Sequence, residues 1–540
     1  MNYRFLFLLL SCSISFGQNY SRQDSLRGQI TAERAWWDLQ HYQLDVTVDI
    51  DNQSISGSNI ITYKVLKNGD RLQLDLQEPM RIEKVVQDGK ELEWTSEGIA
   101  HFVKLRKKMK PGKEEQIKVF FSGKPRIAKN PPWDGGFVFT QDSNGKAFVA
   151  NANQGIGASI WWPNKDHPYD EPDQGTIISV TTPKDLMDVS NGRLIKVDST
   201  ATTKTWTWQV VNPINNYGIN VNIGDYVHFR EIHEGEKGNL DVDYYVLREN
   251  EAKARKQFEQ TTGMLAAFEY WFGPYPFYED GFKLVEAPYL GMEHQSSVTY
   301  GNGYKNGYRG YDLSGSGWGM KFDFIIIHEA GHEWFANNIT TTDVADLWVH
   351  EGFTAYSENL YLDYHFGANA AADYVVGTRK IIMNDKPIIG TYGVREEGSS
   401  DMYYKGANML HTLRQLIEDD LQWRGILRGL NEDFRHQTVS SKQVEDYISK
   451  ATGKDLSAFF NQYLRTTMIP KLEVKMAGNK LSYRYTNIVD DFDMPVIAML
   501  NDTEKWIFPS SEWKTEELDL NLKFFAVKRD FYVDYQLIAN

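Results

Sequence analysis

The sequence predicts a multidomain α+β protein, because its hydropathy pattern changes twice along the chain. Residues 37–237 alternate between apolar and polar side chains in short runs, residues 238–468 start as mixed α/β sequence and become helical, and residues 469–540 return to alternation. A period of two is typical of half-buried strands, and apolar residues three or four positions apart are typical of helices. The length of 540 residues fits about three or four domains.

The first 17 residues are typical of an export signal. Arg4 supplies a positive charge, residues 5–10 are apolar, and residues 15–17 form a small-x-small cleavage site. The apolar run is too short to span a bilayer, so we expect a periplasmic or secreted protein without a transmembrane segment. A lipoprotein site at Cys12 is the second interpretation, because the apolar stretch before it is short. Cys12 is the only cysteine, which excludes an intramolecular disulfide.

Residues 18–36 are assigned to a lead-in and residues 37–237 to a large N-terminal β-domain. Strand-like runs such as residues 203–211, TKTWTWQVV, are separated by turns rich in Asn, Asp and Gly, as in residues 68–70, NGD, and residues 111–113, PGK. One stretch is less ordinary, because residues 161–168 are dense in aromatic residues and proline, with Gln154 just before them. Composition alone favours a packed corner between sheets for this stretch.

Residues 238–468 form the predicted α/β-to-helical domain. Apolar side chains at helical spacing predict a helix over residues 251–272, and Ser440 with Gln443 is a candidate capping box. Further helices are predicted over 344–366, 368–383, 402–419, 424–436 and 441–451. Residues 469–540 resemble a small β-sandwich by strand spacing.

Composition restricts the class of partner. The chain is 41% hydrophobic and 24% charged, as in soluble globular proteins. Its formal net charge of −15 argues against a nucleic-acid partner, because nucleic-acid binders concentrate positive charge.

A metal motif stands at the centre of the helical domain. His328, Glu329 and His332 form the pattern His-Glu-x-x-His, and on a helix the two histidines lie one turn apart on the same face. That arrangement suits two ligands of one metal ion. The alternative is a buried amphipathic helix whose histidines are satisfied by neighbours, and the short motif by itself favours the metal site only modestly.

Glu351 is the candidate third ligand. A catalytic zinc site has three protein ligands and an open position for water, and without a usable cysteine the third ligand should be a carboxylate. Glu351 follows His332 with 18 residues between them, which is enough for a loop at residues 340–343 and a returning helix. Glu358 falls on the same helical face, where it either hydrogen-bonds a ligand imidazole or is a solvated helix charge.

These residues resemble the zinc aminopeptidase family that contains aminopeptidase N and leukotriene hydrolase. The resemblance rests on the two histidines and the glutamate within WVHEGF, and on residues 213–226, PINNYGINVNIGDY. It implies a gluzincin with one zinc ion and a thermolysin-like catalytic domain over residues 238–468. The implied reaction is hydrolysis of N-terminal residues from peptides that have a free N-terminus.

The resemblance also implies a site for the substrate amine. The family's Gly-x-Met-Glu-Asn signature corresponds to residues 290–294, LGMEH, so Glu293 is implied to bind the α-ammonium group. Gln154, nine residues before Pro163, is the implied second amine-binding residue. Between Gln154 and Pro163 the family has an arginine, and Ser159 stands at that position here.

Glu329 and Tyr403 complete the implied mechanism. Glu329 is expected to take the proton from the attacking water, and Tyr403 in YYKGA is expected to hydrogen-bond the oxyanion, with Tyr404 packing elsewhere. Two neighbours depart from the family pattern, since His350 stands where Asn is usual and Glu333 where Gln is common. Both are expected to tune the metal or the substrate pocket.

Three alternatives remain open at the level of the sequence. A thermolysin-type endopeptidase shares the metal ligands but lacks the carboxylate that binds the amine. An added epoxide hydrolase activity is known in the leukotriene branch, and nothing in the sequence requires it. A catalytically dead binding or scaffold protein on the same fold is disfavoured by the intact set of site residues.

Overall fold

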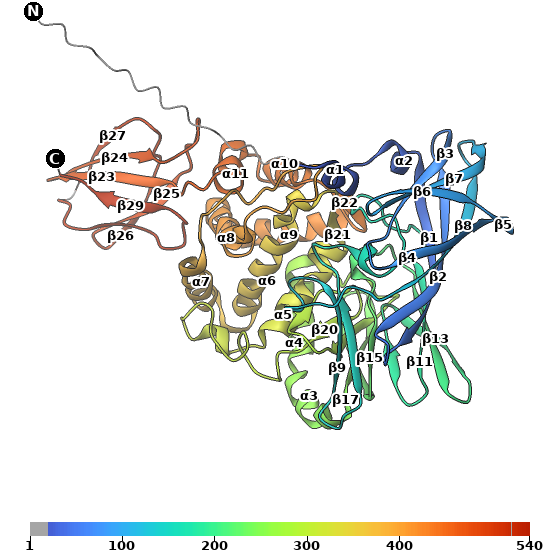
Figure 1. Ribbon diagram of the computed structural model, residues 1–540. Helices are drawn as coiled ribbons and strands as arrows, with labels where there is room; N and C mark the ends of the chain where they lie inside the picture. Colours follow the sequence, from blue (N-terminus) through green and yellow to red (C-terminus); the bar gives the residue numbers. More distant parts are fainter. Residues whose placement is uncertain (1–19, 520, 540) are drawn as a thin grey trace, which may run out of the picture.

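The computed structural model describes residues 20–519 and 521–539 (Figure 1). The predicted export signal at residues 1–17, including Cys12, lies outside the described residues. Within the described ranges, no helix is both long enough and apolar enough to cross a membrane.

Residues 37–224 form the sheets of the N-terminal β-domain (Figure 1, blue to green). Their strands are β1 (Trp37–Asp49), β2 (Ser54–Val65), β3 (Gly69–Asp75), β4 (Arg81–Gln87), β5 (Lys90–Glu91), β6 (Glu93–Glu97), β7 (Ala100–Met109), β8 (Glu114–Gly123), β9 (Gly136–Gln141), β10 (Ala147–Ala152), β11 (Thr176–Pro183), β12 (Met187–Val189), β13 (Arg193–Ser199), β14 (Thr203–Val210) and β15 (Asn222–Gly224).

An eight-stranded sheet in the order β13-β14-β11-β1-β2-β8-β4-β5 is the largest layer of this domain. Strands β1 and β11 run parallel, with Leu44 opposite Ile178, and both side chains are buried. A three-stranded sheet, β3-β7-β6, and a four-stranded sheet, β12-β15-β10-β9, complete the domain. The alternating burial along β1 and β14 is the physical basis of the sequence pattern, because successive side chains point to opposite faces.

The lead-in contains two short helices, α1 (Arg22–Gly28) and α2 (Ala32–Ala35). Helix α1 begins with a capping box between Ser21 and Asp24. The guanidinium group of Arg34 is fully buried and lies 2.6 Å from the carboxylate of Asp75. This buried ion pair fixes the lead-in on the β-domain.

The second domain combines one sheet with a set of helices. Its sheet has the order β16-β17-β18-β20-β19, built from β16 (Tyr226–Gly235), β17 (Gly238–Leu247), β18 (Phe282–Glu286), β19 (Gly291–Met292) and β20 (Val298–Tyr300). The helices are α3 (Glu251–Gln257), α4 (Gln260–Phe272), α5 (Phe324–Gly331), α6 (Trp348–Phe366), α7 (Ala368–Gly377), α8 (Tyr404–Ile417), α9 (Asp420–Asp433), α10 (Ser441–Thr452) and α11 (Ser457–Leu464). Helix α5 packs between β20 and α6.

Several predicted helices differ at their ends. The predicted helix over residues 251–272 is broken at Phe258, whose buried ring packs edge-on against Tyr300. Helix α9 begins four residues earlier than predicted, because the Asp419 side chain caps it by accepting from two backbone N–H groups. The predicted loop at residues 340–343 is partly a strand, since β21 (Ile339–Thr341) pairs in parallel with β22 (Gln437–Val439). The capping box of Ser440 and Gln443 is confirmed.

The C-terminal residues form two small sheets, β27-β24-β23-β29 and β26-β25-β28, at the end of the molecule away from the N-terminal β-domain (Figure 1, red). The strands are β23 (Lys471–Ala477), β24 (Lys480–Thr486), β25 (Val496–Leu500), β26 (Thr503–Ile507), β27 (Lys514–Glu517), β28 (Phe525–Val527) and β29 (Asp534–Leu537). One apolar core is shared by the helical domain and these strands, and a second core fills the N-terminal domain. The predicted α+β class is confirmed.

Candidate active site

Helix α5 carries the metal motif and starts at a well-formed cap. The Asp323 carboxylate accepts from the backbone N–H of Ile325 at 3.1 Å, and it also accepts from the Tyr300 hydroxyl at 2.7 Å. Ile326 is fully buried, as the apolar run before the motif predicts. The apolar face of α5 enters the core, which leaves His328 on the side that faces the cavity.

The end of helix α5 prepares His332 as a ligand. The backbone leaves helical geometry at Phe335 and Ala336, where φ is −127° and 140°. This break turns the Phe335 carbonyl toward the His332 ring, and its oxygen lies 3.0 Å from Nδ1. The Thr354 hydroxyl lies 3.1 Å from the same nitrogen. Because Nδ1 is held by these oxygens, Nε2 is directed to the cavity.

Glu358 orients the other histidine. The Nδ1 atom of His328 lies 2.8 Å from Oε1 of Glu358, and the Tyr374 hydroxyl donates to Oε2 of the same carboxylate at 2.5 Å. Glu358 is fully buried, so it is not a solvated helix charge. A carboxylate can only accept, so Nδ1 donates and Nε2 remains available for a metal.

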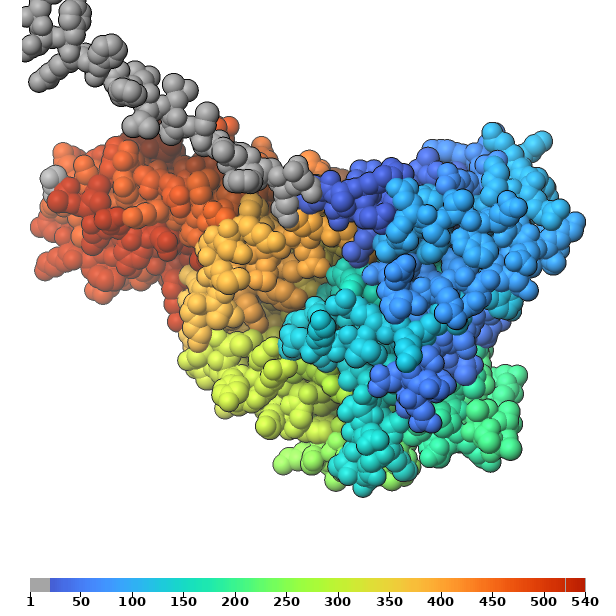
Figure 2. Space-filling model, in the orientation of Figure 1, coloured from blue at the N-terminus to red at the C-terminus, as the bar shows by residue number. Residues whose placement is uncertain are grey.

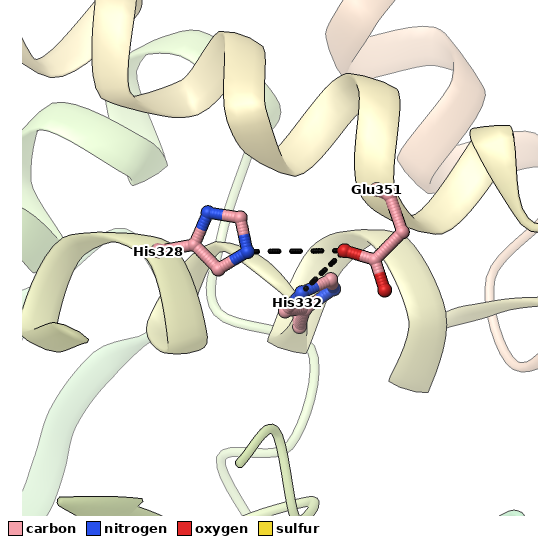
Figure 3. A group of neighbouring side chains, drawn as sticks. All are labelled: His328, His332 and Glu351. Atoms are coloured by element: carbon pink, nitrogen blue, oxygen red, sulfur yellow. Dashed lines mark ion pairs between the residues drawn. The ribbon is translucent and has the colours of Figure 1, made fainter. Parts of the chain in front are cut away.

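Glu351 brings the third ligand atom to the same point (Figure 3). Its Oε2 lies 3.3 Å from Nε2 of His332 and 3.8 Å from Nε2 of His328. Glu351 belongs to the first turn of α6, where the helix dipole favours a negative charge. Burial opposes ionisation, but the charges of His332 and His328 hold the pKa of Glu351 below its ordinary value.

The three residues fit a zinc ion. Ligand atoms about 2.0–2.1 Å from a tetrahedral metal lie roughly 3.3 Å from each other, which is close to the separations found here. The Oε2 atom of Glu351 is buried without a hydrogen-bond partner, so it is an orphaned acceptor that a cation would satisfy. Two imidazoles and one carboxylate are also a donor set that zinc prefers.

Glu329 lies beside the ligands and faces the cavity. Its carboxyl group is largely buried, and burial raises its pKa, although the neighbouring His328 and His332 act in the opposite direction. Strand β19 approaches α5 closely at Gly291, where an added Cβ would lie 2.9 Å from Oε1 of Glu329 and 2.7 Å from a methyl group of Ile325. The glycine therefore lets the strand border the cavity directly above the predicted base.

Gln154 and Glu293 meet at the metal ligands, as the resemblance implies. The Nε2 atom of Gln154 donates to Oε1 of Glu293 at 2.7 Å and to Oε1 of Glu351 at 2.8 Å. Burial, together with the charge of Glu351, raises the pKa of Glu293 to about 7, although His332 opposes this shift. In Figure 2 the cyan-to-teal part of the N-terminal domain lies against the yellow and orange helical domain. The hydrogen bond from Gln154 to Glu351 is one contact between these two domains.

Sequence reasoning missed Tyr217, a further contact of Glu293. Its hydroxyl donates to Oε1 of Glu293 at 3.1 Å. Tyr217 lies within residues 213–226, the segment that carries part of the resemblance, and that position was the only signal available. The carboxylate of Glu293 is therefore held by an amide and a phenol from the N-terminal domain.

Arg395 was also missed, and it holds the segment that carries Gln154. Its guanidinium group donates to the backbone oxygen of Gly155 at 3.1 Å and to the Asp166 carboxylate at 3.2 Å. Gly157 has φ of 90°, and an added Cβ there would lie 2.4 Å from the guanidinium group. Ser159, where the family has arginine, itself hydrogen-bonds Asp166. A cation from a distant loop therefore contacts this segment, in addition to Arg27 of helix α1, which donates to the backbone oxygen of Ile156 at 2.8 Å.

Both tyrosines of YYKGA line the cavity. The Tyr403 ring stacks on the imidazole of His328 with centroids 5.9 Å apart. Tyr404 packs against the apolar core, as expected, but it also contributes to the cavity wall, which the sequence did not predict.

Glu333 and His350 make their hydrogen bonds away from the cavity, so the expectation that they shape the substrate pocket is wrong. The Glu333 carboxyl group accepts from the backbone N–H of Ser296 at 2.8 Å and from the Tyr275 hydroxyl at 3.0 Å. The His350 ring accepts from the backbone N–H of Thr341 at 2.9 Å. Both side chains are buried outside the cavity wall, because each is one helical position away from a ligand that points inward.

The cavity above the ligands has a volume of about 740 Å³. Its wall combines apolar side chains with carboxylates. The apolar residues include Ile156, Leu290, Met292, Tyr308, Leu313, Phe324, Ile325, Ile381 and Met402. The volume is typical of ligand pockets and is sufficient for a short peptide.

Comparison with known families identifies the chain. Residues 257–463 match the peptidase family M1 domain, and residues 39–217 match the peptidase M1 N-terminal domain. The chain belongs to peptidase family M1. Both matched segments contribute to the site, because Gln154 lies in the M1 N-terminal domain and the metal ligands lie in the M1 domain.

Curated relatives of this M1 protein are aminopeptidases. Probable aminopeptidase 1 of Sulfurisphaera tokodaii is 20% identical over 460 residues, which are 81% of this chain and 54% of that protein. Endoplasmic reticulum aminopeptidase 1 of Mus musculus is 26% identical over 218 residues, which are 38% of this chain and 23% of that protein. The chain thus spans about half, or less, of the length of the relatives it matches.

Solved structures show the same fold. An M1 zinc metallopeptidase from Deinococcus radiodurans has a TM-score of 0.69 and 21% identity, and the match covers 81% of this chain and 95% of that chain. A mutant of that metallopeptidase bound to a Tyr-Ser-Ala substrate has a TM-score of 0.66 and 21% identity, covering 81% of this chain and 96% of that chain.

Proposed function

We propose that this M1 protein is a zinc-dependent aminopeptidase that removes N-terminal residues from peptides. The observation that carries the proposal is the Glu293 carboxylate, which Gln154 ties directly to the metal ligand Glu351. An anionic group at a fixed distance from the ligands can bind the α-ammonium group of a substrate and place the first peptide bond at the metal. The names of the curated relatives support this function.

The chain's own residues divide the chemistry between them. A zinc ion held by His328, His332 and Glu351 would supply Lewis acidity and lower the pKa of a water molecule in the open position. Glu329 takes the proton from that water and delivers it to the leaving amine. Its raised pKa suits this role, because a base must also be able to give the proton back.

Tyr403 is proposed to act on the carbonyl oxygen. Its ring stacks beside His328 and its side chain lines the cavity, so its hydroxyl can donate to the negative charge that develops during attack. Glu293 binds the substrate amine, and Gln154 and Tyr217 hold its carboxylate in place. A peptide without a free N-terminus lacks the group that this cluster binds.

Two variants test the assignment. Glu329→Gln should keep bound zinc and lose peptidase activity, because the amide cannot accept the proton. Glu293→Ala should lose most activity on aminoacyl substrates while retaining zinc. Full activity in Glu329→Gln would contradict the role of Glu329 as general base. An unchanged rate in Glu293→Ala would show that Glu293 does not bind the substrate amine.

An N-acetylated peptide separates the exopeptidase from a thermolysin-type endopeptidase. The wild-type protein should cleave Leu-Ala-Phe-amide after its first residue and leave the acetylated form intact. Equal cleavage of both peptides would favour the endopeptidase. Bound zinc with no hydrolysis of either peptide would favour a binding or scaffold role.

We propose in addition that the protein is exported through the signal at residues 1–17. The support is the sequence of this segment, with Arg4 before an apolar run and a small-x-small site at its end. Expression in a bacterial host followed by fractionation and N-terminal sequencing tests it. Cleavage should leave Gln18 first. A membrane-bound form that takes up labelled fatty acid, and loses the label in Cys12→Ser, would instead support a lipoprotein.

A further inference from the structure

The cavity wall is strongly acidic. Among its described lining residues there are five carboxylates and no lysine or arginine, the five being Asp134, Glu293, Glu329, Glu351 and Glu397. Three of them already have a role in the proposed reaction, because Glu351 is a metal ligand, Glu329 is the base and Glu293 binds the amine. Asp134 and Glu397 remain.

Asp134 is satisfied by its own loop. One of its carboxylate oxygens accepts from the backbone N–H of Lys129 and the other from that of Asn130, each at 2.8 Å. The guanidinium group of Arg126 lies 3.7 Å away. Asp134 therefore stabilises the loop at the cavity mouth and has no need of a substrate cation.

Glu397 has no comparable partner. No described residue donates a hydrogen bond to its carboxylate or forms an ion pair with it, although the Lys386 ammonium group reaches its backbone oxygen at 3.3 Å. Arg395, two residues earlier, is occupied by Gly155 and Asp166. Burial is the largest cause that raises the pKa of Glu397, followed by the nearby charge of Glu351, while the charges of Arg395 and Lys386 act in the opposite direction.

The position of Glu397 relates it to the first residue of a substrate. An added Cβ on Gly155 would lie 2.8 Å from Oε1 of Glu397, so the carboxylate rests directly on this glycine. Gly155 follows Gln154, whose amide contacts both Glu293 and Glu351. The substrate's first Cα must lie between its amine at Glu293 and its carbonyl at the metal. Glu397 therefore borders the space that the side chain of the substrate's first residue occupies.

We infer that Glu397 binds a cationic side chain on the first residue of the substrate, so that the enzyme prefers peptides with N-terminal arginine or lysine. This inference rests on the proposed aminopeptidase function and deepens it. A guanidinium group can form two charge-assisted hydrogen bonds with the carboxylate, and the methylene stem of the side chain can lie along apolar wall residues such as Met292. An acidic first residue meets like charge and is disfavoured.

The test compares substrates that share everything but the first side chain. The kcat/KM values of Arg-, Lys-, Leu- and Glu-aminomethylcoumarin are measured for the wild type, Glu397→Gln and Asp134→Asn. Asp134→Asn is the matched control, because it removes one negative charge from the same cavity but keeps an acceptor for the loop. We expect the Arg/Leu ratio to fall at least about tenfold in Glu397→Gln and to stay within about twofold in Asp134→Asn.

Binding measurements separate this inference from the proposed function. Isothermal titration of argininamide and norleucinamide, which present the same amine with and without the cation, should show that only argininamide loses affinity in Glu397→Gln. A wild type that hydrolyses none of the substrates but shows this loss would refute the proposed function alone. An unchanged Arg/Leu ratio, an unchanged affinity for argininamide, or an equal fall in both Asp134→Asn and Glu397→Gln would overturn the role of Glu397.

Discussion

Replacing Glu358 by glutamine should weaken zinc binding about tenfold. The carboxylate accepts from Nδ1 of His328 at 2.8 Å and is itself held by the Tyr374 hydroxyl at 2.5 Å. Glutamine has nearly the same shape and keeps an acceptor oxygen, so the variant removes the negative charge that makes the imidazole a better ligand. Losing a partner of this kind typically lowers metal affinity by about 10–100-fold. Because glutamine keeps an acceptor oxygen, we expect Glu358→Gln to lose about tenfold in zinc affinity, or about 1.4 kcal/mol.

Competition with a chromophoric chelator near neutral pH measures this effect. Glu333→Gln is the matched control, because Glu333 is also buried and directly follows His332, but its carboxyl group is hydrogen-bonded to Ser296 and Tyr275 away from the metal. Burial raises the pKa of Glu333 to about 8, so glutamine closely mimics its protonated form. Equal zinc affinity in the wild type and Glu358→Gln, or an equal loss in Glu333→Gln, would refute the reasoning.

Three further outcomes are expected. Tyr403→Phe should lower kcat by about 10²–10³-fold with little change in KM, because one oxyanion donor is lost, and a change confined to KM would speak against that role. Arg395→Ala should raise KM for aminoacyl substrates several-fold, since the segment carrying Gln154 loses its contacts to the guanidinium group, and steady-state kinetics with an unchanged KM would exclude it. Burial raises the pKa of Glu171 from 4.5 to about 8, and one of its oxygens has no hydrogen-bond partner. Between about pH 4.5 and pH 8 the Glu171 carboxyl group keeps its proton in the folded state and loses it in the unfolded state, so the free energy of unfolding falls as the pH rises. Glu171→Gln should therefore raise Tm at pH 8 but not at pH 5. Equal Tm differences at both pH values would contradict this assignment.

The metal centre could be predicted from the sequence because its three ligands lie close together along the chain. Four residues from His328 to His332 are one helical turn, and 18 residues from His332 to Glu351 are enough for one short helix, one strand and a second helix. The structure places all three ligand atoms within 4.8 Å of one another. Strand alternation and helix spacing likewise predicted the order of the domains, since each depends on which face of one element is buried.

The remaining parts of the site were decided by packing between elements that are far apart in sequence. Gln154 meets Glu351 across 197 positions, and Arg395 supplies a cation to a segment about 240 positions earlier. No local spacing encodes such contacts, because they depend on how the β-domain docks on the helical domain. For the same reason only the structure could turn Glu333 away from the metal and leave Glu397 unpaired in the cavity wall. The sequence by itself determined which residues could hold a metal, and the tertiary structure decided which of the remaining polar residues face the substrate.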